Sequence, residues 1–240
     1  MHLVLCNSKP MASPNSVVVN ICGAARTRGT VEVLSPVTTS VRGGQALAVT
    51  GPNGSGKSTL LRMIAGLDQP SSGTIELLGV PAATARRTKR AQLAVLIDGL
   101  SAYPDLTVAE HFELVASAWG QRHFLGDRPA PAVDTALADA GLTRVADQYP
   151  GELSSGEAQM FALACTLYRP GAVVIVDEPE QRLDGHWRAL SRSLLADALD
   201  AGRTVVVATH DAELRNMLAR SGASDGPRGL ELALTRPDTR

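Results

Sequence analysis

The 240-residue sequence predicts an α/β fold with a mostly parallel sheet that helices cover on both faces. Two apolar, β-branched runs, residues 173–176 and 204–208, indicate buried strands, and the stretch between them at about 187–201 is helical. A third strand at 45–50 passes through a glycine-rich turn into a helix at 57–67. Strands that alternate with helices in this way are typical of parallel sheets.

Further strands are expected where short β-rich or apolar runs occur, at residues 16–21, 31–33, 74–78 and 93–97. Further helices are expected at about 107–118, 133–140 and 154–169. Thr107 and Glu110 form a capping box at the start of the first of these. Only helices are expected between about 104 and 151, which predicts a helical lobe, about residues 104–170, inserted in the sheet domain.

Composition narrows the class of protein. A formal net charge of −1 argues against a nucleic-acid-binding surface, which needs a basic excess. Cys6, Cys22 and Cys165 form no C-x-x-C pair, so we expect free thiols in a reducing cytosol.

No run approaches the roughly 18–20 apolar residues that cross a bilayer, and the first residues lack a signal peptide's apolar segment. We expect a poorly ordered N-terminus at 1–16 and one domain at 17–240.

A glycine-rich loop carries the first chemical signal. Residues 51–59 read GPNGSGKST and match the phosphate-binding pattern G-x-x-x-x-G-K-[ST] between a strand and a helix. The glycines let backbone N–H groups turn toward phosphate oxygens, and the helix N-terminus adds partial positive charge. Lys57 can reach the β- and γ-phosphates, and the Ser58 hydroxyl can bind Mg²⁺. The expected nucleotide contacts are Asn53, Gly54, Ser55, Gly56, Lys57, Ser58 and Thr59. A glycine-rich turn without a ligand is the alternative.

Two carboxylates carry the second signal. The apolar strand at 173–176 ends in Asp177 and Glu178. Asp177 is placed to hold Mg²⁺, and Glu178 is placed to orient or deprotonate an attacking water. An apolar strand that ends in Asp-Glu is common by itself. Its combination with the glycine-rich loop is what indicates nucleotide hydrolysis.

The motifs, taken in order, resemble those of the ABC family of ATPases. Residues 153–157, LSSGE, resemble the family signature LSGGQ and precede the Asp-Glu strand, as the family requires. Asp184 matches the family's D-loop, and His210 matches its switch histidine. The resemblance runs from about Val17 to Met217. It implies a P-loop NTPase core with an N-terminal antiparallel β subdomain and an inserted helical lobe, and it implies ATP and Mg²⁺ as cofactors.

The resemblance also implies a head-to-tail dimer, in which the P-loop of one subunit faces the signature of the other across ATP. The partner's nucleotide would then be contacted by Ser154, Ser155, Gly156, Glu157 and Asp184. Ser154 and Glu157 form a capping box, so their helix directs free N–H groups and a positive dipole end at whatever lies opposite. His210 ends a strand at the carboxyl edge of the sheet, and we expect it to contact the γ-phosphate and the attacking water. A packed or surface histidine is the alternative.

The sequence departs from the family pattern in three places, the last of which involves two residues. Asp98 holds the place of the Q-loop glutamine, where its carboxylate could bind Mg²⁺ or repel the γ-phosphate. Arg28 is the nearest match to the aromatic residue that stacks on adenine, and its guanidinium plane could stack instead. Within the signature, Ser155 replaces a glycine and Glu157 replaces a glutamine. Glu157 fits the site if it folds back onto its own helix as a cap.

The leading functional hypothesis is the ATPase subunit of a membrane transporter, peripheral on the cytoplasmic face, with transmembrane permease subunits on separate chains. A soluble ABC ATPase of an assembly complex is one alternative. A regulatory subunit that binds ATP but hydrolyses little is another, suggested by Asp98 and Ser155. A P-loop kinase or GTPase of another family is the most distant alternative, because it leaves the signature and His210 unexplained.

Overall fold

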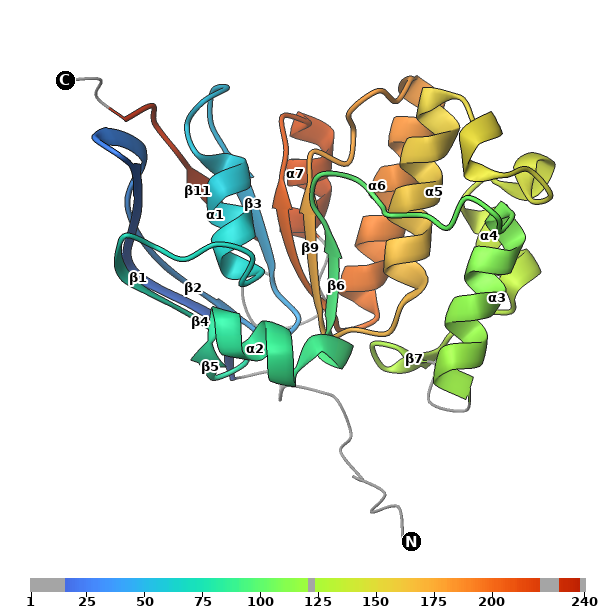
Figure 1. Cartoon of the computed structure of the whole chain (residues 1–240), viewed down its shortest axis with the longest axis horizontal. Helices are drawn as coiled ribbons and strands as arrows, with labels where there is room; N and C mark the ends of the chain where they lie inside the picture. Colours follow the sequence, from blue (N-terminus) through green and yellow to red (C-terminus); the bar gives the residue numbers. More distant parts are fainter. Residues whose placement is uncertain (1–15, 121–123, 221–228, 238–240) are drawn as a thin grey trace, which may run out of the picture.

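A five-stranded parallel sheet forms the centre of the molecule (Figure 1). The computed structural model describes residues 16–120, 124–220 and 229–237. In spatial order the strands are β11 (Gly229–Ala233), β3 (Ala46–Thr50), β10 (Thr204–Ala208), β9 (Val173–Asp177) and β6 (Leu93–Leu96). The predicted parallel sheet is confirmed, and its four predicted strands agree to within one residue. The edge strand β11 was not predicted, because a short half-buried run containing a glycine and an acid gives no clear pattern.

The side chains of the central strands alternate between two separate apolar cores. On β9, Val173 and Ile175 belong to the core that contains α1 (Lys57–Ile64), whereas Val174 and Val176 belong to the core on the opposite face. Strands buried on both faces show as continuous apolar runs, which is why the sequence identified them. The same arrangement leaves both faces of the sheet covered.

A second, antiparallel sheet packs over α1. Its order is β2-β1-β4-β5, with β1 (Val17–Arg28), β2 (Val31–Arg42), β4 (Ser72–Leu77) and β5 (Val80–Pro81). Ile21 and Leu34 from this sheet share a core with Leu60 and Ile64 of α1. Helix α1 therefore lies between the two sheets (Figure 1). The antiparallel β subdomain implied by the resemblance is confirmed.

Helices pack on the other face of the parallel sheet (Figure 1). They are α3 (Val108–Trp119), α4 (Val133–Asp139), α5 (Ser155–Tyr168), α6 (Gly185–Asp200) and α7 (Ala212–Arg220). Three of them, α3, α4 and α5, form the part of the chain where a helical lobe was expected. Cys165 is a free cysteine buried in α5, and burial raises the pKa of its thiol to about 11.

The stretch expected to contain only helices includes a small hairpin. Strands β7 (Phe124–Leu125) and β8 (Arg128–Pro129) pair around Gly126, whose φ is 67°. The hairpin is held by the Asp127 N–H, which donates to the Ala201 carbonyl at 2.9 Å. Two-residue strands carry no alternation of polar and apolar side chains, so this hairpin could not be read from the sequence.

Several smaller features complete the fold. Helix α2 (Ala82–Thr88) and the short 3₁₀ turn η1 (Arg90–Gln92) lead into β6, and two further 3₁₀ turns, η3 (Thr143–Val145) and η4 (Pro150–Glu152), precede α5. Arg86, Arg87 and Arg90 are exposed. No helix within the described residues is both long enough and apolar enough to span a membrane. The N-terminus, which we expected to be poorly ordered over residues 1–16, lies outside the described residues except for Ser16. Cys6 also lies outside them.

Candidate nucleotide-binding site

The glycine-rich loop connects β3 to α1 at the carboxyl edge of the parallel sheet. At Gly51, with φ of 141°, an added Cβ would lie 2.4 Å from the Leu234 carbonyl oxygen. At Gly56, with φ of 93°, it would lie 2.7 Å from the Val33 carbonyl oxygen. Both positions therefore require glycine for backbone conformation and for space. The loop is wedged between the antiparallel sheet on one side and the segment after β11 on the other.

An open cavity of about 340 Å³ lies at this loop, and six of the seven predicted nucleotide contacts of the loop line it. Its lining consists of Val33, Asn53, Gly54, Gly56, Lys57, Ser58, Thr59 and Glu178. Helix α1 begins beside the cavity with no side-chain cap and no acidic residue in its first turn. Its free N–H groups and positive dipole end therefore remain available to an anion, as phosphate binding requires.

Lys57 is 5% exposed and lies at the centre of a cluster of polar groups. Its Nζ donates to the carbonyl oxygens of Gly51 and Pro52, at 3.1 and 3.4 Å. The same Nζ lies 3.0 Å from His210 Nε2 and 3.8 Å from Glu178 Oε1. The structure thus places Lys57, predicted to reach the β- and γ-phosphates, beside Glu178 and His210, both predicted to act on the attacking water.

His210 Nε2 lies within hydrogen-bonding distance of Lys57. An ammonium group only donates hydrogen bonds, so a hydrogen bond here requires Nε2 as the acceptor. Glu178 Oε1 lies 3.4 Å from the same Nε2. The three side chains therefore face one another, and a water could donate to the Glu178 carboxylate there.

Glu178 adopts a backbone conformation that is rare for a residue with a side chain. Its φ is 45°, and its N–H donates to the Ala208 carbonyl at 2.9 Å. Glu178 Oε2 accepts a hydrogen bond from Gln181 Nε2 at 3.2 Å. These two bonds direct the carboxylate toward Lys57 and His210. Strained backbone of this kind costs on the order of 1–3 kcal/mol and is concentrated at functional sites.

Asp177 and Ser58 form a second polar pair beside the cavity. The Ser58 hydroxyl lies close enough to the Asp177 carboxylate to lower its pKa. Burial raises the pKa of Asp177, and the nearby carboxylates of Glu178 and Asp98 raise it further, while Ser58 and Lys57 oppose the shift. Asp177 Oδ1 is buried and has no hydrogen-bond partner among the described residues.

An orphaned buried carboxylate oxygen beside a hydroxyl fits a divalent cation. Within the described residues there is no group of three or more His, Cys, Asp or Glu side chains able to hold a metal ion. A cation at Ser58 and Asp177 would therefore need other ligands. Two protein ligands are typical of Mg²⁺ sites, because Mg²⁺ usually binds one or two protein oxygens and completes its coordination shell with water and phosphate.

Asp98 and Arg28 are not among the residues that line the cavity. Asp98 forms an ion pair with Arg62 of α1, and its side chain is 67% exposed. Its backbone φ is 62°, so the loop turns sharply just after β6. Arg28 is exposed at the end of β1, paired with Val31, and is not among the residues that line the cavity. A metal-binding role for Asp98 and an adenine-stacking role for Arg28 stay predictions.

The signature region lies on the opposite face of the sheet from α1 (Figure 1). The predicted capping box at the start of α5 is confirmed: Ser154 N donates to Glu157 Oε2 at 2.8 Å, and Glu157 N donates to Ser154 Oγ at 3.4 Å. Hydrogen bonds from the Ser154 side chain and backbone lower the pKa of Glu157. Asp184 caps α6, accepting from Trp187 N at 3.0 Å.

Sequence reasoning missed Glu180, which holds the loop that carries His210. Glu180 Oε1 accepts from Thr209 Oγ1 at 2.8 Å and from His210 N at 2.6 Å. Thr209 Oγ1 in turn accepts from Asp211 N at 2.9 Å. Glu180 ends an Asp-Glu-Pro-Glu run, and nothing in this local pattern distinguishes a half-buried carboxylate that accepts two hydrogen bonds from a solvated one.

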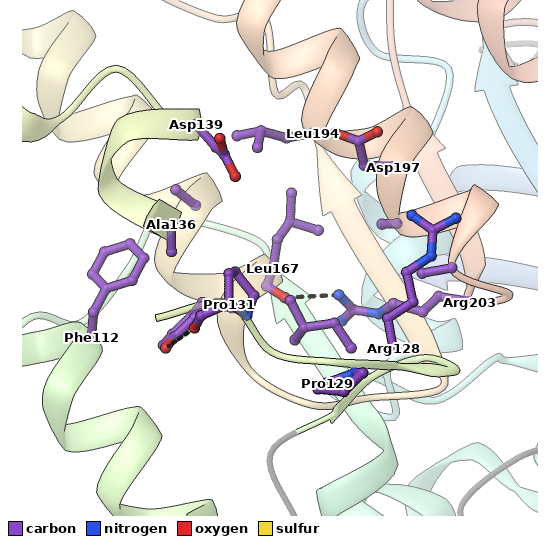
Figure 2. A pocket seen from close by; sticks show the side chains of 15 residues that line it. Phe112, Arg128, Pro129, Pro131, Ala136, Asp139, Leu167, Leu194, Asp197 and Arg203 are labelled. Atoms are coloured by element: carbon purple, nitrogen blue, oxygen red, sulfur yellow. Dashed lines mark hydrogen bonds between the residues drawn. The ribbon is translucent and has the colours of Figure 1, made fainter. Parts of the chain in front are cut away.

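Figure 2 shows a second cavity, of about 330 Å³, enclosed by α3, α4, α5, α6 and the β7–β8 hairpin. Phe112, Leu167 and Leu194 contribute apolar lining, and Asp139 and Asp197 contribute carboxylates. Burial raises the pKa of Asp197, and Asp200 and Asp139 add to the shift. No residue with a predicted nucleotide-binding or catalytic role lines this cavity.

Comparisons with known proteins agree with this geometry. Residues 34–181 match the family model described as ABC transporter. The chain is 36% identical to a phosphonates import ATP-binding protein of Anaeromyxobacter dehalogenans over 217 residues, covering 86% of this chain and 42% of that protein. It is also 36% identical to a lipoprotein-releasing system ATP-binding protein of Bordetella pertussis, covering 77% of this chain and 81% of that protein.

Solved structures share the fold. A dimeric ATP-binding cassette in a post-hydrolysis state, bound to ADP and Pi, superposes with a TM-score of 0.71 at 24% identity, covering 90% of this chain and 94% of that chain. An ATP-binding subunit of an ABC transporter superposes with a TM-score of 0.68 at 27% identity, covering 83% and 82%. The chain spans less than half the length of the phosphonates import protein.

Proposed function

This chain belongs to the ABC transporter family of ATP-binding subunits, and we propose that it binds and hydrolyses ATP to drive a transporter. The membrane-spanning permease subunits would be separate chains, and this subunit would lie at the cytoplasmic face of the membrane. The observation that carries the proposal is the convergence of Lys57, Glu178 and His210 at a loop with an open helix N-terminus.

The proposed hydrolysis divides the work among these three residues. The P-loop N–H groups and Lys57 hold the β- and γ-phosphates. Glu178 accepts a proton from a water that attacks the γ-phosphorus, while the bond to the β–γ bridging oxygen breaks and ADP leaves. His210 orients the water and the γ-phosphate. Positioning and charge stabilisation supply most of the acceleration in phosphoryl transfer.

Mg²⁺ is proposed as the accompanying cation. Ser58 and Asp177 would hold it, since their oxygens are adjacent and Asp177 Oδ1 has no other partner within the described residues. When bound, the ion would neutralise charge on the phosphates. Asp177 would bind the ion directly or through a water. Because its pKa is raised, its carboxylate would be protonated, and binding of the ion weakened, at a higher pH than for an ordinary aspartate.

A head-to-tail dimer is proposed as the active form. The P-loop and the signature helix α5 lie on opposite faces of the sheet in one chain, so a second copy is needed to place a signature against the P-loop (Figure 1). The capped N-terminus of α5 would then direct N–H groups at the γ-phosphate. One relative of the same fold is a dimeric cassette.

A regulatory subunit that binds ATP but hydrolyses little is the second candidate. The Asp98–Arg62 ion pair favours it, because it holds the residue in the Q-loop place toward α1 and not toward the cavity. We assign no transported substrate, since relatives named for phosphonate import and for lipoprotein release are equally similar.

The test is steady-state ATP hydrolysis by the wild type beside Glu178→Gln, with size exclusion in the presence of ATP. We expect Glu178→Gln to lose hydrolysis by about 10²-fold or more, the contribution of a general base, while still binding ATP and forming a dimer. Glu113→Gln, an exposed residue of α3, is the matched control and should retain wild-type activity. Equal inactivity of wild type and mutant, with ATP bound by both, would favour the regulatory candidate.

A further inference from the structure

The segment that follows β11 forms the outer wall of the P-loop. β11 is the neighbour of β3 in the sheet (Figure 1), and it runs parallel with Ala233 opposite Thr50. The chain then continues alongside the loop: Leu234 N donates to the Thr50 carbonyl at 2.8 Å, and Leu234 is 7% exposed. No motif in the sequence connects this segment with nucleotide binding.

Arg236 extends this contact to the tip of the loop. Its Nε donates a hydrogen bond to the Asn53 carbonyl oxygen at 3.0 Å. Within the part of the chain that the structure describes, no carboxylate forms an ion pair with Arg236, and its side chain is exposed. This hydrogen bond places the guanidinium group next to the loop.

Peptide geometry connects this bond with the cavity. In a trans peptide the C=O and the following N–H point in opposite directions. A hydrogen bond that holds the Asn53 C=O toward Arg236 therefore turns the Gly54 N–H to the other side of the loop. Gly54 lines the cavity, and with φ of 81° it has a conformation that few other residues would hold there. The N–H so oriented is one of the donors that phosphate binding uses.

We propose that Arg236 is a positioning residue of the nucleotide site. It holds the Asn53–Gly54 peptide so that the Gly54 N–H faces the phosphates, and its charge attracts the same anion. The inference rests on the proposed function, because it takes the phosphates of ATP as the ligand of the cavity. It adds a residue that lies 183 positions from the peptide it orients.

Three variants separate the hydrogen bond from the charge. Arg236→Met removes both, Arg236→Gln keeps a donor without charge, and Arg236→Lys keeps a charge and a donor. We expect Arg236→Met to weaken ATP binding by about five- to tenfold, the size of one hydrogen bond made by a charged group at an exposed position. Arg236→Gln should lie between Arg236→Met and the wild type, and Arg236→Lys should be within about twofold of the wild type.

The measurements are the Kd for ATP, the KM and kcat of hydrolysis, and the melting temperature with and without ATP. KM should rise with Kd while kcat changes by less than about twofold, because the loop contacts substrate and transition state alike. Without ATP all variants should melt within about 2 °C of the wild type, and the rise in Tm on adding ATP should be smaller for Arg236→Met. Arg86→Met, in exposed α2, is the control and should match the wild type.

Two results would overturn the inference while leaving the proposed function intact. One is ATP binding by Arg236→Met equal to that of an active wild type. The other is a loss of melting temperature without ATP that accounts for the whole effect, which would make Arg236 a general stabilising contact. Failure of the wild type to bind ATP would overturn both the inference and the proposed function.

Discussion

Glu178 illustrates how a single residue is held in a costly position by its surroundings. Its φ of 45° is unfavourable for a side chain, yet three contacts fix it: the bond from its N–H to Ala208, the bond from Gln181 to Oε2, and the approach of Lys57. A conformation of this kind persists only where neighbouring structure determines it. The carboxylate therefore points into the cavity before any ligand binds, which is the preorganisation that catalysis requires.

At the same scale, Asp177 predicts a pH dependence of Mg²⁺ binding. Because burial raises its pKa, the carboxyl takes up a proton at a higher pH than an ordinary aspartate, whose pKa is about 3.9. A protonated carboxyl does not bind the ion, so the apparent Mg²⁺ affinity should fall as pH decreases toward that raised pKa. Titration calorimetry with a non-hydrolysable ATP analogue, corrected for protonation of the free nucleotide, measures this.

Asp177→Asn is the control for this experiment, since it should bind Mg²⁺ weakly at every pH and show no titration of its own. A midpoint at or below the ordinary aspartate pKa of about 3.9 would contradict the assignment of Asp177 as the protein's carboxylate ligand.

At the scale of elements, the loops that follow β9 and β10 are placed side by side by strand register and by hydrogen bonds. Register places Asp177 opposite Ala208, so the two loops begin at the same edge of the sheet. Glu180 then connects them by accepting from Thr209 Oγ1 and His210 N. These two hydrogen bonds consequently connect the loop that carries Glu178 to the loop that carries His210.

Replacement of Glu180 should therefore disturb His210 without removing a contact to substrate. We expect Glu180→Ala to lower kcat by about tenfold, in the range seen when groups that orient a ligand or catalytic side chain are removed, with KM changed by less than about twofold. Glu180→Gln retains a carbonyl oxygen that can accept the same two bonds, so it should recover most of kcat.

Steady-state kinetics of both variants beside Glu113→Ala, on the exposed side of α3, tests this. Equal losses in Glu180→Ala and Glu180→Gln would mean that the negative charge matters more than the hydrogen bonds. A change confined to KM would contradict a positioning role.

At the scale of the whole molecule, the buried side chain of Arg203 connects the start of β10 to the C-terminal end of α5 and the loop after it. Arg203 is 1% exposed and immediately precedes β10. Its guanidinium donates to the carbonyl oxygens of Leu167, Gly171 and Arg169, at 2.7, 2.8 and 3.2 Å. Figure 2 shows the bond to Leu167 at the wall of the second cavity. Burial lowers the pKa of Arg203 to about 10, so it remains charged near neutral pH.

Loss of Arg203 should lower global stability more than it lowers ATP affinity. Arg203→Met leaves three buried carbonyls without their donor, and we expect about 3 kcal/mol of destabilisation, since each bond to a charged group contributes about 1.5–3 kcal/mol before the gain from apolar burial. Urea denaturation measures it, with exposed Arg188→Met as the control. A change below about 0.5 kcal/mol would show that other contacts satisfy these carbonyls.

Local patterns in the sequence determined the parts of this protein that depend on a few neighbouring residues. The glycine-rich loop, the Asp177–Glu178 pair and the capping boxes at Thr107 and Ser154 each span ten residues or fewer, and the continuous apolar runs identified the buried strands. Such patterns work because backbone preference, capping and burial act over one or two turns or strands.

Only the tertiary structure decided which distant residues meet. Lys57 and His210 lie 153 positions apart, and Arg236 and Asn53 lie 183 positions apart. The register of parallel strands and the packing of loops at one sheet edge produce both contacts, and no local pattern encodes them. Glu180 was missed for the same reason. Its two hydrogen-bond donors, Thr209 Oγ1 and His210 N, follow another strand of the sheet and are distant in the sequence.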